Sequence, residues 1–304
     1  MNRYAAAAFA VAVFVTSGAW AQGTDFSKVE EKVTDLGHGT YRIEGAGGNT
    51  TMAVGTDGII MVDGQFAPLH DKLKAAIAKL SDKPIKYLVN THYHGDHSGG
   101  NVPFAKDGAT IVAQENVKKR LSEGATNGLT GAKVPPAPQE AWPAKTYKSS
   151  MTLTVKGRTA QLKHAVRAHT DGDTYVYFKD ANVLSTGDTV VIGRYPNIDF
   201  AVGGSIKGMI AAVDTYLKLA DDNTKVVPGH GPVANKAKLV EYRKMLATAR
   251  DRIAKLIKAG KSEQDAVAAT PFAADLDKQV DANERQSTNF VRVIYNSLKP
   301  PKKA

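Results

Sequence analysis

The chain has 304 residues, of which 42% are hydrophobic and 23% charged, with 40 Lys and Arg against 30 Asp and Glu. This balance is that of a globular protein and excludes a disordered, collagen-like or multi-span membrane chain. Because the chain contains no cysteine, disulfide scaffolds, iron–sulfur clusters and cysteine nucleophiles are also excluded, and any metal must be held by His and carboxylates.

The first 21 residues have the pattern of a secretory signal peptide. Arg3 gives a positive start, residues 4–15 form an apolar run, and Ala19-Trp20-Ala21 supplies a small-x-small cleavage site. The apolar run is shorter than the about 20 residues that span a bilayer. We therefore predict cleavage after Ala21 rather than a stable membrane anchor, and a periplasmic or secreted protein.

Gly-rich turns divide the next part of the chain into short apolar or alternating runs, which predict strands. Apolar residues at helical spacing predict helices between them. The predicted strands cover residues 41–44, 50–54, 59–63, 85–90, 110–113, 151–155, 161–166, 174–178, 182–185 and 225–227. The predicted helices cover residues 68–80, 115–121 and 205–219, and the chain is mostly helical from Ala234 onward.

This order of elements predicts an α+β fold with two sheets sandwiched by helices. We assign residues 22–233 to a catalytic domain and residues 234–304 to a helical C-terminal extension packed on it. Residues 123–148 form a long loop rich in Gly and Pro, which is either a lid over a functional site or a surface insertion. The excess of basic residues is scattered over helical stretches, which favours a solvated basic face over a nucleic-acid site.

Potential metal ligands are concentrated immediately after the predicted strand at residues 85–90. His92, His94, Asp96 and His97 lie within six residues of one another. Neutral imidazoles and carboxylates are ligands that suit zinc and similar divalent ions. Glycines at positions 95, 99 and 100 let the backbone turn so that these side chains can converge. Four donors supply half of each of two metal sites, so further ligands must come from later in the chain.

Three later residues are candidates because each follows a predicted strand and is flanked by Gly or small polar residues: His169, Asp188 and His230. His164 is the nearest rival to His169, but it lies within a strand run. We interpret His164, together with His38 and His70, as structural or surface residues.

These segments resemble the metallo-β-lactamase superfamily in type and order. The resemblance rests on the His-x-His-x-Asp-His segment, the later His169, Gly187-Asp188 and Pro228-Gly229-His230-Gly231, and on Asp63 at the end of a strand. It implies an αββα sandwich with a two-metal site at one edge. It further implies that His92, His94 and His169 hold the first metal, that Asp96, His97 and His230 hold the second, and that Asp188 bridges them. Asp63 would orient a ligand imidazole.

The resemblance implies a zinc-dependent hydrolase with two Zn²⁺, iron or manganese being alternatives. A water shared by two cations would act as a hydroxide nucleophile on a small-molecule carbonyl ester, thioester, lactone or lactam, with Asp96 helping to orient it. Asp188 stands where the most familiar β-lactamases of the superfamily have cysteine, which favours a thioesterase or lactonase over a β-lactamase proper. An iron-dependent oxidoreductase and a metal-binding protein without turnover are further alternatives.

Two interpretations stay open for Arg194 and Tyr195, which follow Asp188 by six and seven residues. They line the substrate pocket, as a tyrosine near this position does in lactonases of the superfamily, or they belong to a packed turn. The oligomeric state does not follow from the sequence.

Overall fold

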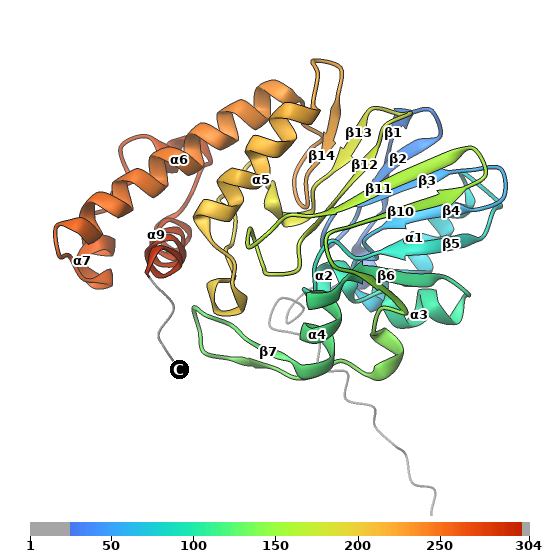
Figure 1. Cartoon of the computed structure of the whole chain (residues 1–304), viewed down its shortest axis with the longest axis horizontal. Coiled ribbons are helices and arrows are strands. Elements are labelled where there is room, and N and C mark those ends of the chain that lie inside the picture. The colour runs from blue at the N-terminus through green and yellow to red at the C-terminus, as the bar shows by residue number, and fades with distance from the viewer. Residues whose placement is uncertain (1–24, 300–304) are drawn as a thin grey trace, which may run out of the picture.

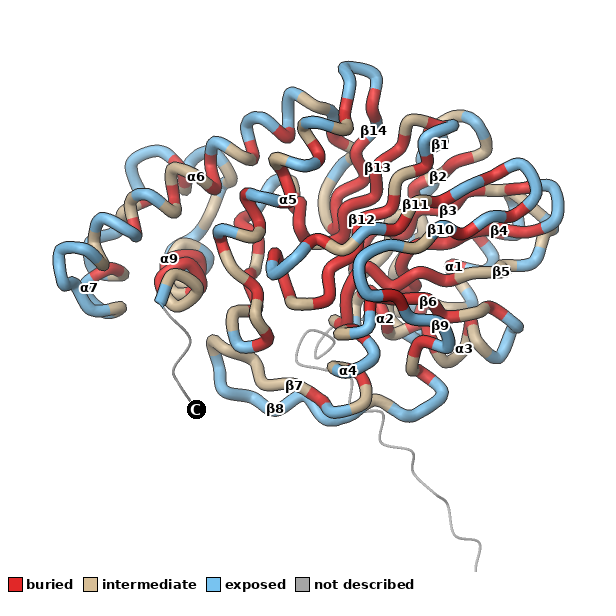
Figure 2. Tube along the Cα trace, in the orientation of Figure 1, coloured by how far each residue is buried: buried red, intermediate tan, exposed pale blue. Residues whose placement is uncertain are grey.

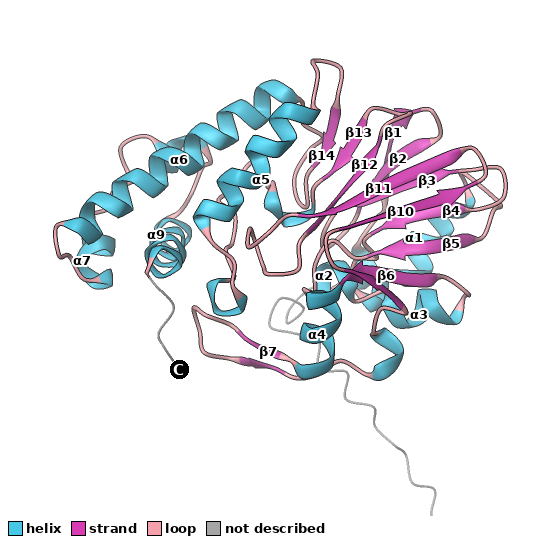
Figure 3. Cartoon of the chain, viewed as in Figure 1, coloured by secondary structure: helices cyan, strands magenta, loops and turns pink. Residues whose placement is uncertain are grey.

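A computed structural model describes residues 25–299, so the predicted signal peptide lies outside the described residues. Its core is a pair of facing β-sheets with helices on both outer faces (Figures 1 and 3). The helices at the C-terminal end of the chain gather at one side of this sandwich (Figure 1). No helix among residues 25–299 is both long and apolar enough to cross a membrane.

The first sheet has seven strands in the order β1-β2-β3-β4-β5-β6-β9. Neighbours from β1 to β4 are antiparallel and joined by short turns, whereas β4, β5, β6 and β9 are parallel. Parallel strands need longer crossovers, and helices supply them here. The strands are β1 Lys32–Gly37, β2 Thr40–Glu44, β3 Thr50–Val54, β4 Ile59–Val62, β5 Ile85–Val89, β6 Thr110–Gln114 and β9 Lys145–Tyr147.

The second sheet has five strands in chain order, β10 to β14, and only the last pair is parallel. Its strands are β10 Ser150–Val155, β11 Arg158–His164, β12 Thr174–Phe178, β13 Val183–Ser185 and β14 Lys225–Val227. The crossover between β13 and β14 contains helix α5, Ile206–Leu219, which Ser205 caps by accepting a hydrogen bond from the Gly208 amide.

Strand β4 shows how the layers are held together, because all four of its side chains are buried. Ile60 and Val62 belong to the core between the sheets, which also contains Phe178 and Val183 of the second sheet. Ile59 and Met61 point the other way, into the core that packs against α1 and α3. Figure 2 shows buried residues, in red, along the central strands. The burial of β4 on both faces confirms the predicted αββα sandwich.

Helices cover the first sheet at α1 His70–Ala78, α2 Gly95–Ser98, α3 Asn101–Lys106 and α4 Glu115–Glu123. Short 3₁₀ turns lie at η1 Phe26–Lys28, η2 Ala67–Leu69, η3 Gln139–Ala141, η4 Gly187–Thr189 and η5 Phe200–Val202. The long loop predicted at 123–148 is not wholly irregular. It contains the hairpin β7 Ala125–Thr126 and β8 Lys133–Val134, then η3 and β9.

The C-terminal helices are α6 Lys236–Lys258, α7 Glu263–Ala268, α8 Leu276–Gln279 and α9 Glu284–Leu298. Capping boxes begin α7 at Ser262 and α9 at Asn283. Helices α6 and α9 share one buried cluster with α5, so they are part of the hydrophobic core that covers the second sheet. Phe290 of α9 stacks on Tyr195, with ring centroids 4.2 Å apart.

Phe290→Ala is expected to destabilise the protein by about 3–5 kcal/mol, because it removes a buried ring and leaves a cavity. Phe290 is only 2% exposed and contacts Tyr195 and Phe272. Urea denaturation followed by circular dichroism measures the loss. Val240→Ala on α6, where the side chain is 52% exposed, is the control and should change stability by less than about 0.5 kcal/mol. A loss below 1 kcal/mol for Phe290→Ala would contradict this account of the helix packing.

Candidate metal centre

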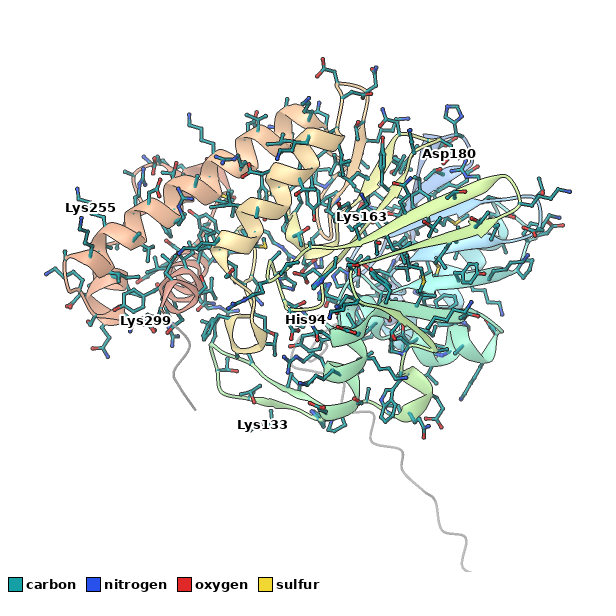
Figure 4. The ribbon with its side chains drawn as sticks, viewed as in Figure 1. His94, Lys133, Lys163, Asp180, Lys255 and Lys299 are labelled. Carbon is teal, nitrogen blue, oxygen red and sulfur yellow. The ribbon has the colours of Figure 1, made fainter. Side chains whose placement is uncertain are left out.

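The predicted ligands meet at one edge of the sandwich, in the loops that follow the strands. His92, His94, Asp96 and His97 follow β5, with the last two on the short helix α2. His169 lies between β11 and β12, Asp188 follows β13 in η4, and His230 follows β14. His94 is labelled near the middle of the view in Figure 4, below the strands.

The donor atoms form three overlapping groups, in each of which all atoms lie within 4.8 Å of one another. The groups are His92, His94 and His169; His92, His97 and Asp188; and Asp96, His97 and His230. The first and third groups have the membership that the resemblance implies. All seven residues predicted as ligands are therefore brought together.

Asp188 lies between the two outer groups. Its Oδ1 is 3.2 Å from His97 Nε2 and 3.4 Å from His230 Nε2. Its Oδ2 is 3.7 Å from His169 Nε2, which belongs to the other group. One carboxylate thus presents one oxygen to each side, which is the geometry expected of a bridging ligand.

The donor set suits cations, because its buried nitrogens and oxygens face one another rather than hydrogen-bond donors. Among the described residues, His92 Nε2 and Asp188 Oδ1 are buried without a hydrogen-bond partner. His94 Nδ1 and His169 Nε2 are 2.9 Å apart. Buried polar atoms left in this way are costly unless an ion or a water satisfies them.

The imidazoles and carboxylates of the cluster shift one another's pKa values. Burial and the neighbouring His97 hold the pKa of His92 well below its usual range, so its imidazole is neutral. Burial raises the pKa of Asp188, but His230 and His97 outweigh it and bring the pKa well below the ordinary value. Likewise, the pKa of Asp96 falls to about 2 despite burial, mainly because of His97 and His230. Burial lowers the pKa of His97 and His230 as well, but Asp188 and Asp96 outweigh it and raise both, that of His230 to about 9. Binding of a divalent cation to these rings would therefore release protons.

Asp63 supports the cluster from behind. Its Oδ2 is 2.8 Å from His97 Nδ1, and it accepts hydrogen bonds from the amide and hydroxyl of Thr91, both at 2.7 Å. The carboxylate therefore fixes the ring orientation of His97 and the start of the ligand loop. This is the place that the sequence resemblance implies for Asp63.

Asp199 is a second carboxylate that, like Asp63, contacts a predicted ligand from outside the donor groups, and the sequence did not predict it. Asp199 Oδ2 lies 3.2 Å from His94 Nε2 and accepts a hydrogen bond from the Tyr93 hydroxyl at 2.5 Å. Its backbone amide also donates to His169 O at 2.8 Å. Burial lowers the pKa of His94, but the hydrogen bond and charge of Asp199 outweigh it and raise the pKa. The sequence signal was slight, because Asp199 is distinguished only as the one acidic residue between Thr189 and Ser205.

The loop that carries His230 is held by two buried side chains of the first sheet. Asn49 Nδ2 donates to the carbonyls of Pro228 and Gly231, both at 2.9 Å. Arg42 donates through Nε to Asn49 Oδ1 at 2.9 Å and through Nη2 to Gly231 O at 3.0 Å. These bonds join the two sheets directly beneath the cluster and set the position of His230.

A family model described as the metallo-beta-lactamase superfamily matches residues 43–230. The chain belongs to this superfamily. The matched segment contains Asp63 and all seven residues of the cluster.

Relatives in the superfamily differ in what they act on. The chain is 28% identical over 234 residues to a linear primary-alkylsulfatase of Pseudomonas sp., covering 65% of this chain and 44% of that protein. It is 28% identical over 163 residues to a hydroxyacylglutathione hydrolase of Pelagibacter ubique, covering 52% of this chain and 57% of that protein. The chain thus spans about half the length of these curated relatives.

Solved structures of the superfamily share the fold. A metallo-beta-lactamase from Pontibacter korlensis aligns with a TM-score of 0.59 at 18% sequence identity, covering 72% of this chain and 99% of that chain. This level of identity supports the common architecture and carries no information on substrate.

Tyr195 and Arg194 differ in their surroundings. Tyr195 is 9% exposed, stacks on Phe290 and donates a hydrogen bond to Asp277 Oδ1 at 2.7 Å, so its side chain serves the packing of the C-terminal helices. This geometry matches the packed-turn interpretation. Arg194 is exposed and next to Gly193, in the segment whose Ile192 amide donates to His230 O at 3.0 Å.

The three remaining histidines lie outside the groups. His164 Nε2 is 2.9 Å from Asp171 O, and His70 lies between Asp71 and Asp107 at 2.8 and 3.0 Å. His38 is exposed in the turn between β1 and β2. The structure therefore places His169, not His164, with the other predicted ligands.

Proposed function

We propose that this protein is an exported dinuclear zinc hydrolase that cleaves a carbonyl ester, thioester, lactone or lactam bond in a small molecule. The observation that carries the proposal is the arrangement of seven His and Asp donors in overlapping groups, with Asp188 between them. Hydrolase names among the relatives support the reaction class. The leader-like first 21 residues support export.

In this proposal His92, His94 and His169 would hold one zinc, Asp96, His97 and His230 would hold the other, and Asp188 would be shared between them. Bound zinc ions would lower the pKa of a water and polarise the scissile bond. Asp96 has a second carboxylate oxygen with which to orient the attacking water. Asp63 and Asp199 keep the rings of His97 and His94 in one orientation each, so that little reorganisation accompanies the reaction.

Initial rates of the purified protein, zinc-loaded and chelated, test the proposal. The panel holds a chromogenic cephalosporin, an acyl-homoserine lactone, a glutathione thioester, an activated phosphodiester and, because of the alkylsulfatase relative, an alkyl sulfate. We expect chelator-sensitive turnover of a carbonyl substrate well above the others. Turnover of the alkyl sulfate alone would show that the enzyme cleaves a sulfate ester rather than a carbonyl bond. Equal rates with and without chelator would refute the metal dependence.

Metal analysis with absorption spectroscopy distinguishes zinc from iron or manganese. Zinc is colourless and redox-silent, whereas iron at a His and carboxylate site absorbs and changes oxidation state. We expect two zinc ions per chain. A coloured, iron-containing protein would favour the oxidoreductase alternative.

Asp199→Asn is expected to lower kcat/KM by about 10-fold, within the 10–100-fold range for groups that orient metal ligands. The amide keeps the size of the carboxylate but loses the charge that faces His94 Nε2. Asp222→Asn, at an exposed position, is the control and should behave as wild type. Unchanged kcat/KM and zinc retention in Asp199→Asn would show that this carboxylate does not support the site.

A further inference from the structure

The first described segment of the chain packs against the loop that carries Asp63. Phe26 lies against Phe66 with ring centroids 5.4 Å apart. Lys72 of α1 donates through Nζ to the carbonyls of Ser27 and Val29 at 2.5 and 2.8 Å. These contacts place the next residues of the segment, including Glu31, beside the end of β2 and the Asp63 loop.

Glu31 meets Gln65 above Gly45. Gln65 Nε2 donates to Glu31 Oε2 at 2.9 Å. The other two oxygens, Glu31 Oε1 and Gln65 Oε1, are buried and have no hydrogen-bond partner among the described residues. Both lie close to one point, since a Cβ added to Gly45 would be 2.5 Å from the first and 2.6 Å from the second. Both acceptors thus lie on the Gly45 side of the pair, and neither receives a hydrogen bond from the described residues.

A proton on Glu31 Oε1 would give these two unpaired oxygens a hydrogen bond. A carboxyl group protonated at Oε1 donates to Gln65 Oε1 while Oε2 still accepts from Nε2, which closes a ring of two hydrogen bonds. Without that proton two buried acceptors stay unsatisfied, at a cost of about 1–3 kcal/mol for each group. The geometry therefore favours the neutral acid.

The charged groups near Glu31 do not lower the pKa of its carboxyl enough to cancel the effect of burial. Burial raises the pKa of the Glu31 carboxyl, and the hydrogen bond from Gln65 and the charge of Lys72 oppose that rise without cancelling it. Lys72 uses its ammonium group on two backbone carbonyls. Lys28, Glu30 and Lys32 line the adjacent surface hollow with exposed side chains, and Glu44 is paired with Arg42.

The backbone of residues 63–65 is hydrogen-bonded to the segment that carries the predicted metal ligands. Asp63 and Gln65 both have left-handed backbones, with φ of 62° and 53°, a conformation that costs free energy for residues other than Gly. The Gly64 amide donates to His97 O at 2.8 Å, and the Gly100 amide donates to Gln65 O at 3.1 Å. Gln65 is fully buried, so fixing its side chain also fixes the loop that holds His97.

We propose that Glu31 is a positioning residue, which as a neutral carboxylic acid paired with Gln65 holds the Asp63 loop in place beneath His97. The effect on zinc and turnover rests on the proposed function, whereas the acid–amide pair itself does not. Glu31 touches neither substrate nor metal in this proposal. It acts through Gln65, the left-handed loop and Asp63.

Three variants of the full chain separate the pair from other roles of the segment. Glu31→Gln can form the same ring as an amide–amide pair at every pH, and Glu31→Ala cannot form it at any pH. Glu30→Gln makes the same substitution at the exposed neighbouring position and is the matched control.

The first measurement is the thermal midpoint as a function of pH, which needs no activity. A carboxyl whose folded pKa is raised contributes stability that is present below its ordinary pKa and is lost as pH rises through the folded value. We therefore expect the midpoint of Glu31→Gln to gain on wild type as pH rises, while Glu30→Gln shows no such trend. A difference between Glu31→Gln and wild type that is constant with pH would overturn the neutral acid.

The second measurement is zinc retention against a competing chelator, with the pH–rate profile of the zinc-loaded protein. We expect Glu31→Ala to retain zinc about 10-fold less well, the lower end of the range for outer groups, and Glu31→Gln to retain it as wild type does at low pH and better at high pH. Equal zinc retention in all three variants would overturn the positioning role. If wild type binds no zinc, the proposed function fails, and the thermal data alone still decide whether the pair is neutral.

Discussion

Asp188→Ala is expected to lower kcat/KM by about 1,000-fold or more and to reduce bound zinc, with the fold intact. Metal-based stabilisation of a transition state is worth several kcal/mol, and about 4 kcal/mol corresponds to a factor of about 1,000. Asp188 is the residue whose two oxygens face both outer groups, Oδ1 toward His97 and His230 and Oδ2 toward His169. Its loss should therefore weaken both proposed zinc sites together.

The measurement combines zinc content, circular dichroism and rates on whichever substrate the panel identifies. Asp222→Ala, at an exposed position in the turn before β14, is the control and should keep wild-type zinc and rate. Asp188→Asn keeps the shape but not the charge, so it should also lose most activity. Wild-type turnover in either Asp188 variant would exclude the bridging role.

The residues of the cluster could be predicted because short stretches of sequence are enough to recognise them. Four donors stand within six residues, and His169, Asp188 and His230 each follow a strand next to Gly or small residues. When strands of two facing sheets end at one edge, the residues that follow them are brought together. Strand ends and polar loops were therefore sufficient to name the residues that the structure brings together.

Asp199 could not be predicted because its role depends on a loop that returns to the site. It lies between Asn197, whose carbonyl is 2.9 Å from His169 Nδ1, and Phe200. Nothing in a stretch of single polar residues indicates that the chain folds back onto His169, in the loop between β11 and β12. Sequence periodicity indicates helices and strands, whereas this contact is made between two loops, so periodicity does not predict it.

Strand β1 and helices α2 and α3 were missed for a different reason. Strand β1 at the edge of its sheet has four exposed residues in a row, from Lys32 to Asp35, so it lacks the apolar alternation that marks a half-buried strand. Helices α2 and α3 are four and six residues long and begin in the Gly-rich ligand segment. Their short length and low helix propensity hide them, and tertiary contacts to the Asp63 loop stabilise them.

Gly48 is the second position at which a small change should have a large effect. A Cβ added to Gly48 would lie 2.1 Å from Cε1, 2.5 Å from Nδ1 and 2.6 Å from Nε2 of His97. The His97 ring is fully buried and bonded at Nδ1 to Asp63 at 2.8 Å. It cannot move away from a methyl group without breaking that bond or leaving the other donors.

Gly48→Ala is therefore expected to lower kcat/KM by about 100-fold, the upper end of the range for changes that disturb ligand orientation. The zinc held by Asp96, His97 and His230 should be lost first, which competition with a graded series of chelators can measure. Gly95→Ala is the matched control in the ligand segment itself, because an added Cβ there meets nothing within 4 Å. If Gly48→Ala retained both zinc ions and the wild-type rate, His97 would not be a ligand in the orientation that Asp63 gives it. If Gly95→Ala lost activity equally, the cause would be the flexibility of the segment rather than the contact between Gly48 and His97.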